Sequence, residues 1–304
     1  MANAQPHKLD TISAFHAFRE LPRPEHPLIS VINYDAMKRL RDDEPKAIVN
    51  NFYTISLKRS LNAKMKYGQQ EYDFDEGVML FMAPGQVFSI AAKGELVHSG
   101  WGLFFHPDFL WNTALAQKIK QFNYFSYDVH EALFLSDKEE ANIIDIFKNI
   151  QQEYHQNIDS FSQDVIIAQL DLLLTYAQRF YQRQFITRKI YSHKILQRLE
   201  ALLNNYFADD NLLQQGIPTV SFVAGQLNIS PGYLSETLKT LTGQGTQQHI
   251  HDKLIEKAKE KLAGNALTVS EVAYALGFEH TQSFSKFFKA KTAVTPLAFR
   301  QSFN

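Results

Sequence analysis

Two short runs of polar and cationic side chains, about fifty residues apart, have the types that can contact nucleic-acid bases and phosphates. Serine, threonine and glutamine can bond to base edges, glutamate can accept from cytosine N4, and lysine can contact guanine or a phosphate. In segments 231–242 and 280–291 these residues alternate with apolar ones, as in a helix that buries one face. For each side chain, a solvated or phosphate-facing role stays open beside base reading. The sets predicted to be free are Gly232, Ser235, Glu236 and Lys239, and then Thr281, Gln282, Ser283, Ser285, Lys286 and Lys289.

Both segments belong to an internal repeat with an offset of 49 to 50 residues. Val223-Ala224-x-x-Leu227 recurs as Val272-Ala273-x-x-Leu276, and Leu234-Ser235-x-x-Leu238-Lys239 recurs as Phe284-Ser285-x-x-Phe288-Lys289. Each copy has the pattern of a short helix, a tight turn and a second helix. Local signals support the helix ends, because Ser230-Pro231 is a typical N-terminus and Thr268-x-x-Glu271 is a capping box. Gly277 stands where the second copy must turn sharply. We therefore predict helix-turn-helix motifs at about 219–242 and 269–292.

The second copy continues into a longer pattern. Val269–Arg300 (VSEVAYALGFEHTQSFSKFFKAKTAVTPLAFR) has a Val-Ala pair, Leu-Gly-Phe, an aromatic-Ser-basic-x-Phe-Lys run, and Thr-Pro followed by Arg. This pattern closely resembles the signature of the AraC family of transcriptional regulators, and His249–Leu262 resembles the family's linker helix. The resemblance covers roughly residues 190–300. It implies a domain that places two recognition helices in successive major grooves of double-stranded DNA, roughly 34 Å apart.

Among the positions that depart from the family pattern, three affect the backbone or a DNA contact. Ala293 stands where the family usually has glycine, so a positive φ there would strain the backbone. Lys253 replaces a frequent arginine, which removes a bidentate contact. Glu236 replaces a frequent basic residue, which favours base reading over phosphate contact at that position.

The first half of the chain has the texture of a β domain. Short apolar runs between about residues 29 and 109 are separated by turn signals such as Pro84-Gly85, which is typical of a sandwich or barrel. Tyr72–Ile90 and Gly100–Leu110 resemble the cupin-like sensor found in many AraC-family members. Aromatic side chains here are mostly core by default, although a barrel can hold a small ligand among them. The candidate ligand-binding residues are Asn51, Gln69, Gln86 and Trp101.

A long helix predicted over about 161–184 has two apolar stripes. One contains Val165, Ala168, Leu172, Tyr176 and Phe180. A helix that is apolar on two sides needs two neighbours, of which one is its own domain and the other is expected to be a second copy of the chain. The second stripe contains Leu170, Leu173, Leu174, Ala177 and Tyr181.

No pattern indicates an active site or a metal centre. Cysteine is absent, and no phosphate-binding glycine loop or nucleophile elbow occurs. His98 and His106 lack the H-x-H spacing of metal-binding cupins, and the His249-x-His251 pair on a helix is expected at the surface. We therefore expect no catalytic residue, no metal and no cofactor.

Charge is divided unevenly along the chain. Residues 1–189 carry 20 basic and 23 acidic side chains, whereas residues 190–304 carry 11 basic and 9 acidic ones. The second half is only weakly cationic, so specificity must depend on the positions of a few lysines and polar groups. No apolar stretch approaches the ~18–20 residues that cross a bilayer. Residues 1–30 lack the apolar core of a secretory signal, so we expect a cytoplasmic protein with no membrane partner.

Together these patterns predict an α+β protein of two domains. An N-terminal cupin-like β-barrel carries a helical dimerisation segment, and a C-terminal all-α domain carries two helix-turn-helix motifs. The expected partners are promoter DNA, a small-molecule effector, a second copy in a homodimer, and RNA polymerase for an activator. Two alternatives stay open: a front domain that only dimerises or binds a protein partner, and a cupin-type enzyme fused to a DNA-binding domain. The predicted boundaries are 1–28 for an N-terminal arm, 29–134 for the sensor, 135–187 for the dimerisation segment and 188–304 for the DNA-binding domain.

Overall fold

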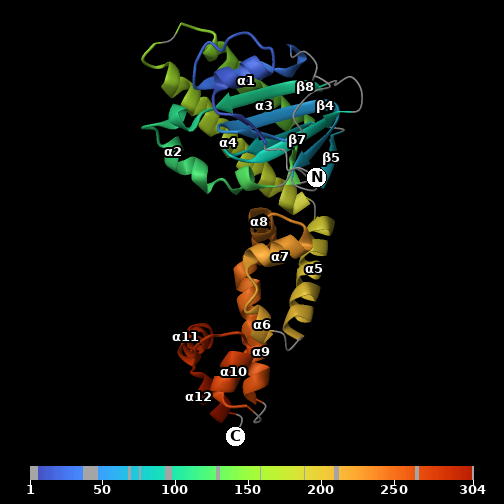
Figure 1. The fold of residues 1–304 in the computed structure, drawn as a ribbon, viewed down its shortest axis with the longest axis vertical. Helices are drawn as coiled ribbons and strands as arrows, with labels where there is room; N and C mark the ends of the chain where they lie inside the picture. Colours follow the sequence, from blue (N-terminus) through green and yellow to red (C-terminus); the bar gives the residue numbers. More distant parts are fainter. Residues whose placement is uncertain are drawn as a thin grey trace. The chain divides into compact units, whose positions relative to one another are not determined.

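The computed structural model describes residues 6–36, 47–67, 70–74, 77–92, 98–127, 131–157, 159–187, 189–208, 212–263 and 267–302. The chain forms two compact units, Met1–Gln184 and Phe185–Asn304 (Figure 1). The first is a mixed sheet-and-helix unit and the second is helical. The predicted domain boundary, between residues 187 and 188, lies just downstream of the division between the units.

Within the described residues of the first unit, nine strands belong to one sheet built around the long strand β4. This strand pairs antiparallel with β5, β6, β7 and β8, while β2 pairs with β8, β3 with β7 and β9 with β6. The exception is β1, which runs parallel to β3. The strands are β1 (His7–Leu9), β2 (Ile29–Asn33), β3 (Ile48–Asn50), β4 (Tyr53–Tyr67), β5 (Gln70–Phe74), β6 (Val78–Met82), β7 (Val87–Ala92), β8 (His98–Phe105) and β9 (Leu133–Phe134).

Alternation along β4 gives the sheet two different faces. Ile55 and Leu57 are fully buried on the face where Trp101 stacks on Phe147, with ring centroids 6.0 Å apart. Phe147 belongs to α3 (Asp137–Tyr154), which together with α4 (Ser162–Thr187) packs on that face. The opposite face meets a core cluster that contains Phe52, Phe104 and Tyr34. Closure of this sheet into a cupin-like barrel stays a prediction.

The first residues of the described chain are part of the core and not a separate arm. The predicted short helix is present as α1 (Ile12–Phe18). Leu9, Ile12 and Phe15 are buried, and the Phe15 ring lies 4.3 Å from that of Phe104 between centroids. The sequence did not predict this contribution for two reasons. Several prolines follow α1, and the pairing of β1 with β3 joins residues about forty positions apart.

The long helix α4 buries one of its predicted apolar stripes. Leu170, Leu173, Leu174, Ala177 and Tyr181 are at most 4% exposed. The other stripe divides, because Phe180 is buried whereas Val165 and Leu172 are 42% and 44% exposed. The remaining short elements of the unit are η1 (Tyr34–Ala36), η2 (Pro107–Leu110), α2 (Leu115–Lys118), η3 (Ile119–Gln121) and η4 (Asn123–Ser126).

The second unit is built around α9, which contacts helices of both repeat copies. It packs against α5 and against α8 of the first copy, and also against α10 of the second copy and α12. None of the described helices in either unit is long and apolar enough to cross a membrane. The helices are α5 (Lys189–Ala208), α6 (Leu212–Gln215), α7 (Val220–Leu227), α8 (Pro231–Thr242), α9 (Thr246–Ala263), α10 (Val269–Ala275), α11 (Thr281–Thr292) and α12 (Pro296–Gln301).

Candidate nucleic-acid interface

Side-chain caps start α7, α8 and α10 in the repeat, whereas α11 begins after His280 without one, and two of these caps confirm sequence predictions. The Ser230 hydroxyl accepts from the backbone N–H of Tyr233 at 3.2 Å, with Pro231 opening α8. Thr268 and Glu271 form the predicted capping box of α10. These caps satisfy backbone N–H groups that the helix itself leaves unpaired, so each capped helix begins at a defined residue.

The turns between the paired helices use the left-handed backbone region at equivalent places. Asn228 ends α7 with φ of 54°, and Gly277, 49 residues later, has φ of 80°. A Cβ on Gly277 would lie 3.1 Å from the Leu212 carbonyl oxygen, so glycine also allows a close approach there. The predicted sharp turn at Gly277 is therefore confirmed.

The recognition helices also end alike. Thr242 and Thr292 each donate a hydrogen bond to the carbonyl four residues earlier, at 2.8 Å in both cases. The following residues, Gly243 and Ala293, cap α8 and α11 with φ of 77° and 64°. Alanine has a Cβ that crowds the backbone in this region, so the strain expected at Ala293 is present.

In α11 the buried and free faces separate as predicted. Phe284 and Phe288 are fully buried. Gln282, Ser283, Lys286 and Lys289 are exposed, while Thr281 and Ser285 are partly buried.

In α8 the polar face is less open. Lys239 is exposed, but Gly232, Ser235 and Glu236 are partly buried. The Ser235 hydroxyl shares a 3.0 Å hydrogen bond with that of Thr246, the first residue of α9. Ser235 is therefore tied to the linker helix and is less available to a ligand than the polar residues of α11.

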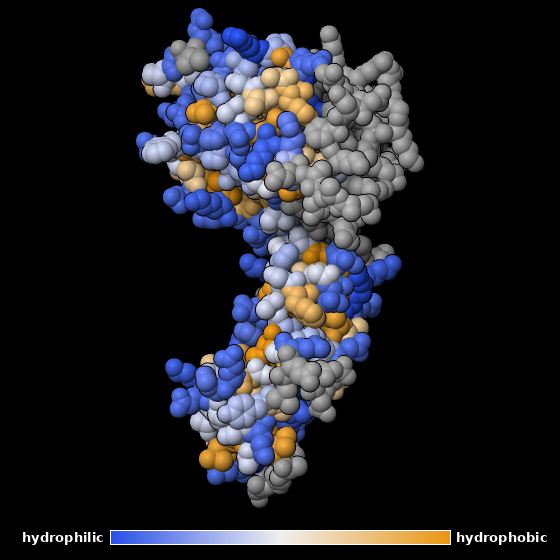
Figure 2. Space-filling view, in the orientation of Figure 1, coloured by the Kyte–Doolittle hydropathy of each residue, from blue (hydrophilic) through white to orange (hydrophobic). Residues whose placement is uncertain are grey.

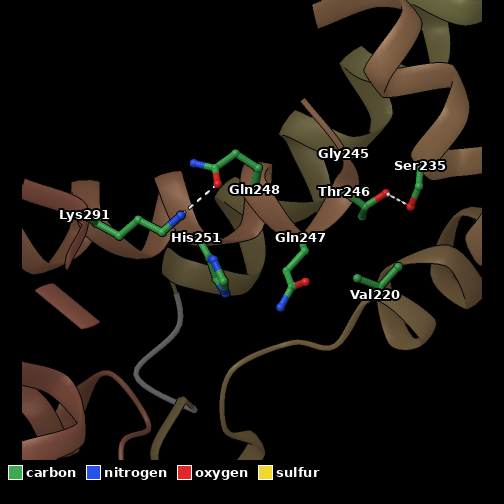
Figure 3. A pocket seen from close by; sticks show the side chains of 8 residues that line it. All are labelled: Val220, Ser235, Gly245, Thr246, Gln247, Gln248, His251 and Lys291. Carbon is green, nitrogen blue, oxygen red and sulfur yellow. Dashed lines mark hydrogen bonds between the residues drawn. The ribbon is translucent and has the colours of Figure 1, made fainter. Parts of the chain in front are cut away.

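A polar hollow, here called the central recess, lies between the two copies (Figure 3). Its volume is about 500 Å³. Lys291, near the end of α11, donates from Nζ to Oε1 of Gln248 at 2.8 Å. Sequence reasoning missed this feature, because its lining comes from four helices and follows no single helical face. The lining residues are Val220, Ser235, Gly245, Thr246, Gln247, Gln248, His251 and Lys291.

The two histidines of α9 lie partly at the surface and are partly buried. His249 Nε2 and the Thr242 hydroxyl lie 3.0 Å apart in a hydrogen bond. The His251 ring packs edge-on against Phe287, with centroids 5.1 Å apart. Desolvation, aided by the charge of Lys291, lowers the pKa of His251, which favours the neutral form of this ring in the recess.

In the part of this unit that the structure describes, two lysines of α9 are paired with carboxylates, whereas three lysines of the recognition helices are not. In α9, Lys253 pairs with Glu256 at 2.8 Å and Lys257 pairs with Glu260 at 2.7 Å. Among the described residues, none of the ion pairs involves Lys239, Lys286 or Lys289. Hydrophilic side chains cover much of the visible face of this unit, with apolar ones in small patches between them (Figure 2).

Three of the four candidate ligand-binding residues of the first unit lie within the described residues. The Asn51 amide donates a hydrogen bond to the Asp10 carboxylate. The Gln86 side chain accepts from the Ala83 backbone N–H and donates to the Phe125 carbonyl, and both of these Gln86 bonds are 2.8 Å long. Trp101 lies on the helix-covered face of the sheet. Gln69 lies outside the described residues. Their ligand role stays a prediction.

Residues 223–302 match the family model of a helix-turn-helix domain. The C-terminal unit contains a helix-turn-helix domain of the AraC type. In this AraC-type domain, α7 with α8 and α10 with α11 form the two helix-turn-helix motifs, and α9 is the linker between them.

Several known proteins are similar over the AraC-type domain. An uncharacterised HTH-type transcriptional regulator from the cgkA 5′ region of Pseudoalteromonas carrageenovora is 36% identical over 101 residues, which cover 33% of this chain and 55% of that protein. Regulatory protein PocR of Salmonella typhimurium is 33% identical over 82 residues, 27% of each chain. The chain thus spans about half of the first relative and about a quarter of the second. Among solved structures, the C-terminal domain of the response regulator AraT from Geobacillus stearothermophilus is 29% identical, with a TM-score of 0.31, and covers 36% of this chain and 84% of that one.

Proposed function

We propose that this chain is a sequence-specific DNA-binding regulator of transcription. The observation that carries the proposal is the pair of helix-turn-helix motifs in one AraC-type domain, in which α11 presents a free polar and cationic face. The relatives named as HTH-type transcriptional regulators support it. Such a protein works in the cytoplasm and, as an activator, also contacts RNA polymerase; catalysis has no part in the proposal.

The two recognition helices have different parts in the proposed complex. Gln282 and Lys286 lie one turn apart on α11, so both reach the floor of one major groove and read bases. Among the candidates of α8, Lys239 is exposed while Gly232, Ser235 and Glu236 are partly buried, which favours a contact of Lys239 to phosphate. The central recess, with Lys291 at its edge, faces the DNA backbone that passes between the two grooves.

Binding of the full chain to DNA tests the proposal. An operator is first selected from a random duplex library, and its affinity is then measured by fluorescence anisotropy at several salt concentrations. We expect Gln282→Ala or Lys286→Ala to cost about 1–3 kcal/mol of operator binding, because a base contact is lost. For Lys286→Ala, loss of specificity marks a base contact, whereas uniform weakening with a shallower salt slope marks a phosphate contact.

Lys138→Ala is the matched control, because this exposed lysine lies on α3 of the other unit. It should leave both the affinity and the salt slope unchanged. Selection that enriches no sequence would contradict sequence-specific binding, and unchanged affinity in both α11 variants would contradict the proposed reading helix.

We further propose that the chain acts as a homodimer through the exposed stripe of α4. Val165 and Leu172 of α4, together with Phe161 just before it, recur at helical spacing and are 42%, 44% and 68% exposed. Gln163 donates to the Phe109 carbonyl at 2.8 Å, which holds the start of α4 beside η2, and the exposed Trp111 follows η2. An apolar strip of this kind fits an equivalent strip on a second copy.

The sheet unit is proposed to bind a small-molecule effector that favours one arrangement of the regulator over another. The polar groups Lys58, Ser56 and Thr54 on one face of β4 support this role over a unit that only dimerises.

A further inference from the structure

A lysine projects from the sheet toward the apolar core of the first unit. Thr54, Ser56 and Lys58 lie on the same face of β4, because side chains alternate along a strand. This face packs against the core cluster that contains Tyr34, Leu80 and Phe104. The ammonium of Lys58 lies 3.7 Å from the centre of the Tyr34 ring. A positive charge is thus held at the edge of a hydrophobic core.

Within the described part of the chain, no carboxylate pairs with this ammonium, and its recorded contact is the aromatic ring. A ring face stabilises a cation by much less than a carboxylate does, and an unpaired charge in apolar surroundings is costly. Desolvation lowers the pKa of Lys58 to about 7, so it retains substantial positive charge at neutral pH. Part of its surface stays accessible, which leaves a route from solvent.

Hydroxyl and amide groups continue from Lys58 along the same face. The Tyr34 hydroxyl shares a 2.7 Å hydrogen bond with Ser56. A Cβ at Gly102 on β8 would lie only 2.5 Å from the Tyr34 oxygen, so the absence of a side chain there makes room for this hydroxyl. Further along, the Asn50 amide donates to Thr54 at 3.5 Å, while Asn50 Oδ1 is buried without a partner among the described residues.

We propose that this inner face of β4 binds a small monocarboxylate, with the Lys58 ammonium neutralising the carboxylate and the Tyr34 and Ser56 hydroxyls bonding to it. The inference rests on the proposed effector-responsive function and deepens it by naming the chemical class of the effector. A carboxylate with an apolar remainder fits, because the Lys58 ammonium supplies the cation at the Tyr34 ring and the neighbours Leu80 and Phe104 are apolar.

Thermal stability of the full-length protein tests the site. The probes are sodium carboxylates from acetate to octanoate together with benzoate, each compared with the uncharged amide of the same skeleton. We expect at least one carboxylate to raise the Tm of the wild-type protein in a saturable way, while its amide does not. Lys58→Met, which keeps length and removes charge, should weaken that carboxylate at least tenfold, whereas Lys58→Arg should retain binding better than Lys58→Met.

Lys138→Met is the control, because this exposed lysine of α3 loses the same charge outside the core. Its response should equal that of the wild type. The proposal is overturned if no carboxylate stabilises the wild type beyond its amide, or if Lys58→Met responds as the wild type does.

Operator binding by the same proteins separates this inference from the proposed function. A carboxylate response without DNA binding would retain the site and refute the regulator. DNA binding without a carboxylate response would retain the regulator and refute the site.

Discussion

Ala293 occupies a backbone conformation that its repeat partner fills with glycine. Gly243 and Ala293 cap equivalent helices with nearly the same φ, and each follows a threonine that bonds back into its helix. Because these surroundings match, the two positions differ mainly in the Cβ, which is unfavourable in the left-handed region. The molecule thus contains an internal comparison of the cost of one methyl group.

Ala293→Gly should therefore stabilise the AraC-type domain. We expect a gain of about 1 kcal/mol, because relief of the Cβ contact exceeds the entropy cost of glycine. Guanidinium unfolding followed by circular dichroism measures it. Ala290→Gly, at an exposed position inside α11, is the control and should instead cost roughly 0.5–1 kcal/mol. A lower unfolding midpoint for Ala293→Gly would show that the left-handed cap is not strained.

Lys58 predicts a pH dependence of stability with a defined sign. Its pKa is about 7 in the folded chain, against an ordinary 10.5, so between these values the unfolded chain holds a proton that the native state has released. The free energy of unfolding should rise with pH across this window, and the full cost of the buried charge is present below it. Arg19, whose charge also lowers this pKa, stays protonated there, as does Tyr34, whose pKa burial raises to about 12.

Urea unfolding of wild type and Lys58→Met measures this linkage. The variant should be the more stable protein at about pH 6, and its advantage should shrink by about pH 9. An advantage that does not change with pH would mean that Lys58 has an ordinary pKa.

Residue-level prediction from sequence succeeds where the signal is local. Ser230 and Thr268 cap their helices as predicted, because the residues that make each cap lie within three positions of one another. Lys58 gave no such signal. Its environment depends on Tyr34 and Phe104, which strand pairing brings together from distant parts of the chain.

At the scale of elements, α4 shows both the power and the limit of periodicity. The pattern predicted two apolar stripes, and one of them is buried. Periodicity could not assign Phe180 to the core. It shows which residues share a face of a helix, but it does not show where along that face the packing partners from other elements begin. The central recess was beyond prediction for a related reason, since four helices supply its lining.

Leu172→Glu should break the proposed dimer. A carboxylate in the middle of the exposed stripe would be buried against the partner copy without a counter-ion, which weakens association by tenfold or more. Sedimentation velocity over a concentration series measures the dissociation constant. Gln178→Glu adds the same charge at an exposed position off the stripe and should leave it unchanged. Equal association of both variants would place the dimer contact elsewhere.

At the scale of the whole molecule, the division between units defines where the DNA-binding part can be separated. Phe185 is 2% exposed, and its ring lies 5.0 Å from that of Tyr233 between centroids. Ser192 also donates to the Phe185 carbonyl at 3.3 Å. Phe185 therefore belongs to the AraC-type domain, although sequence analysis placed the boundary after it.

A fragment of residues 185–304 should consequently be more stable than one of residues 188–304. We expect a difference of roughly 1–3 kcal/mol, the value of one buried aromatic side chain. Thermal unfolding of the two fragments compares them, and Phe185→Ala in the longer fragment should reproduce most of the loss. Both fragments should be monomeric, because they lack the exposed stripe of α4. Equal melting temperatures would show that the domain begins after Phe185.

Because residues 7–18 are part of the sheet core, they affect the abundance of the protein in a cell. Phe15 packs against both Phe52 and Phe104. A chain that starts downstream of α1 would therefore expose these two aromatic rings of the core to solvent. Quality-control proteases and chaperones act on such exposed surface, and a loss of one or two kcal/mol can change abundance several-fold. A shortened translation product or a substitution at Phe15 would thus reduce the number of regulator molecules without altering any residue that touches DNA.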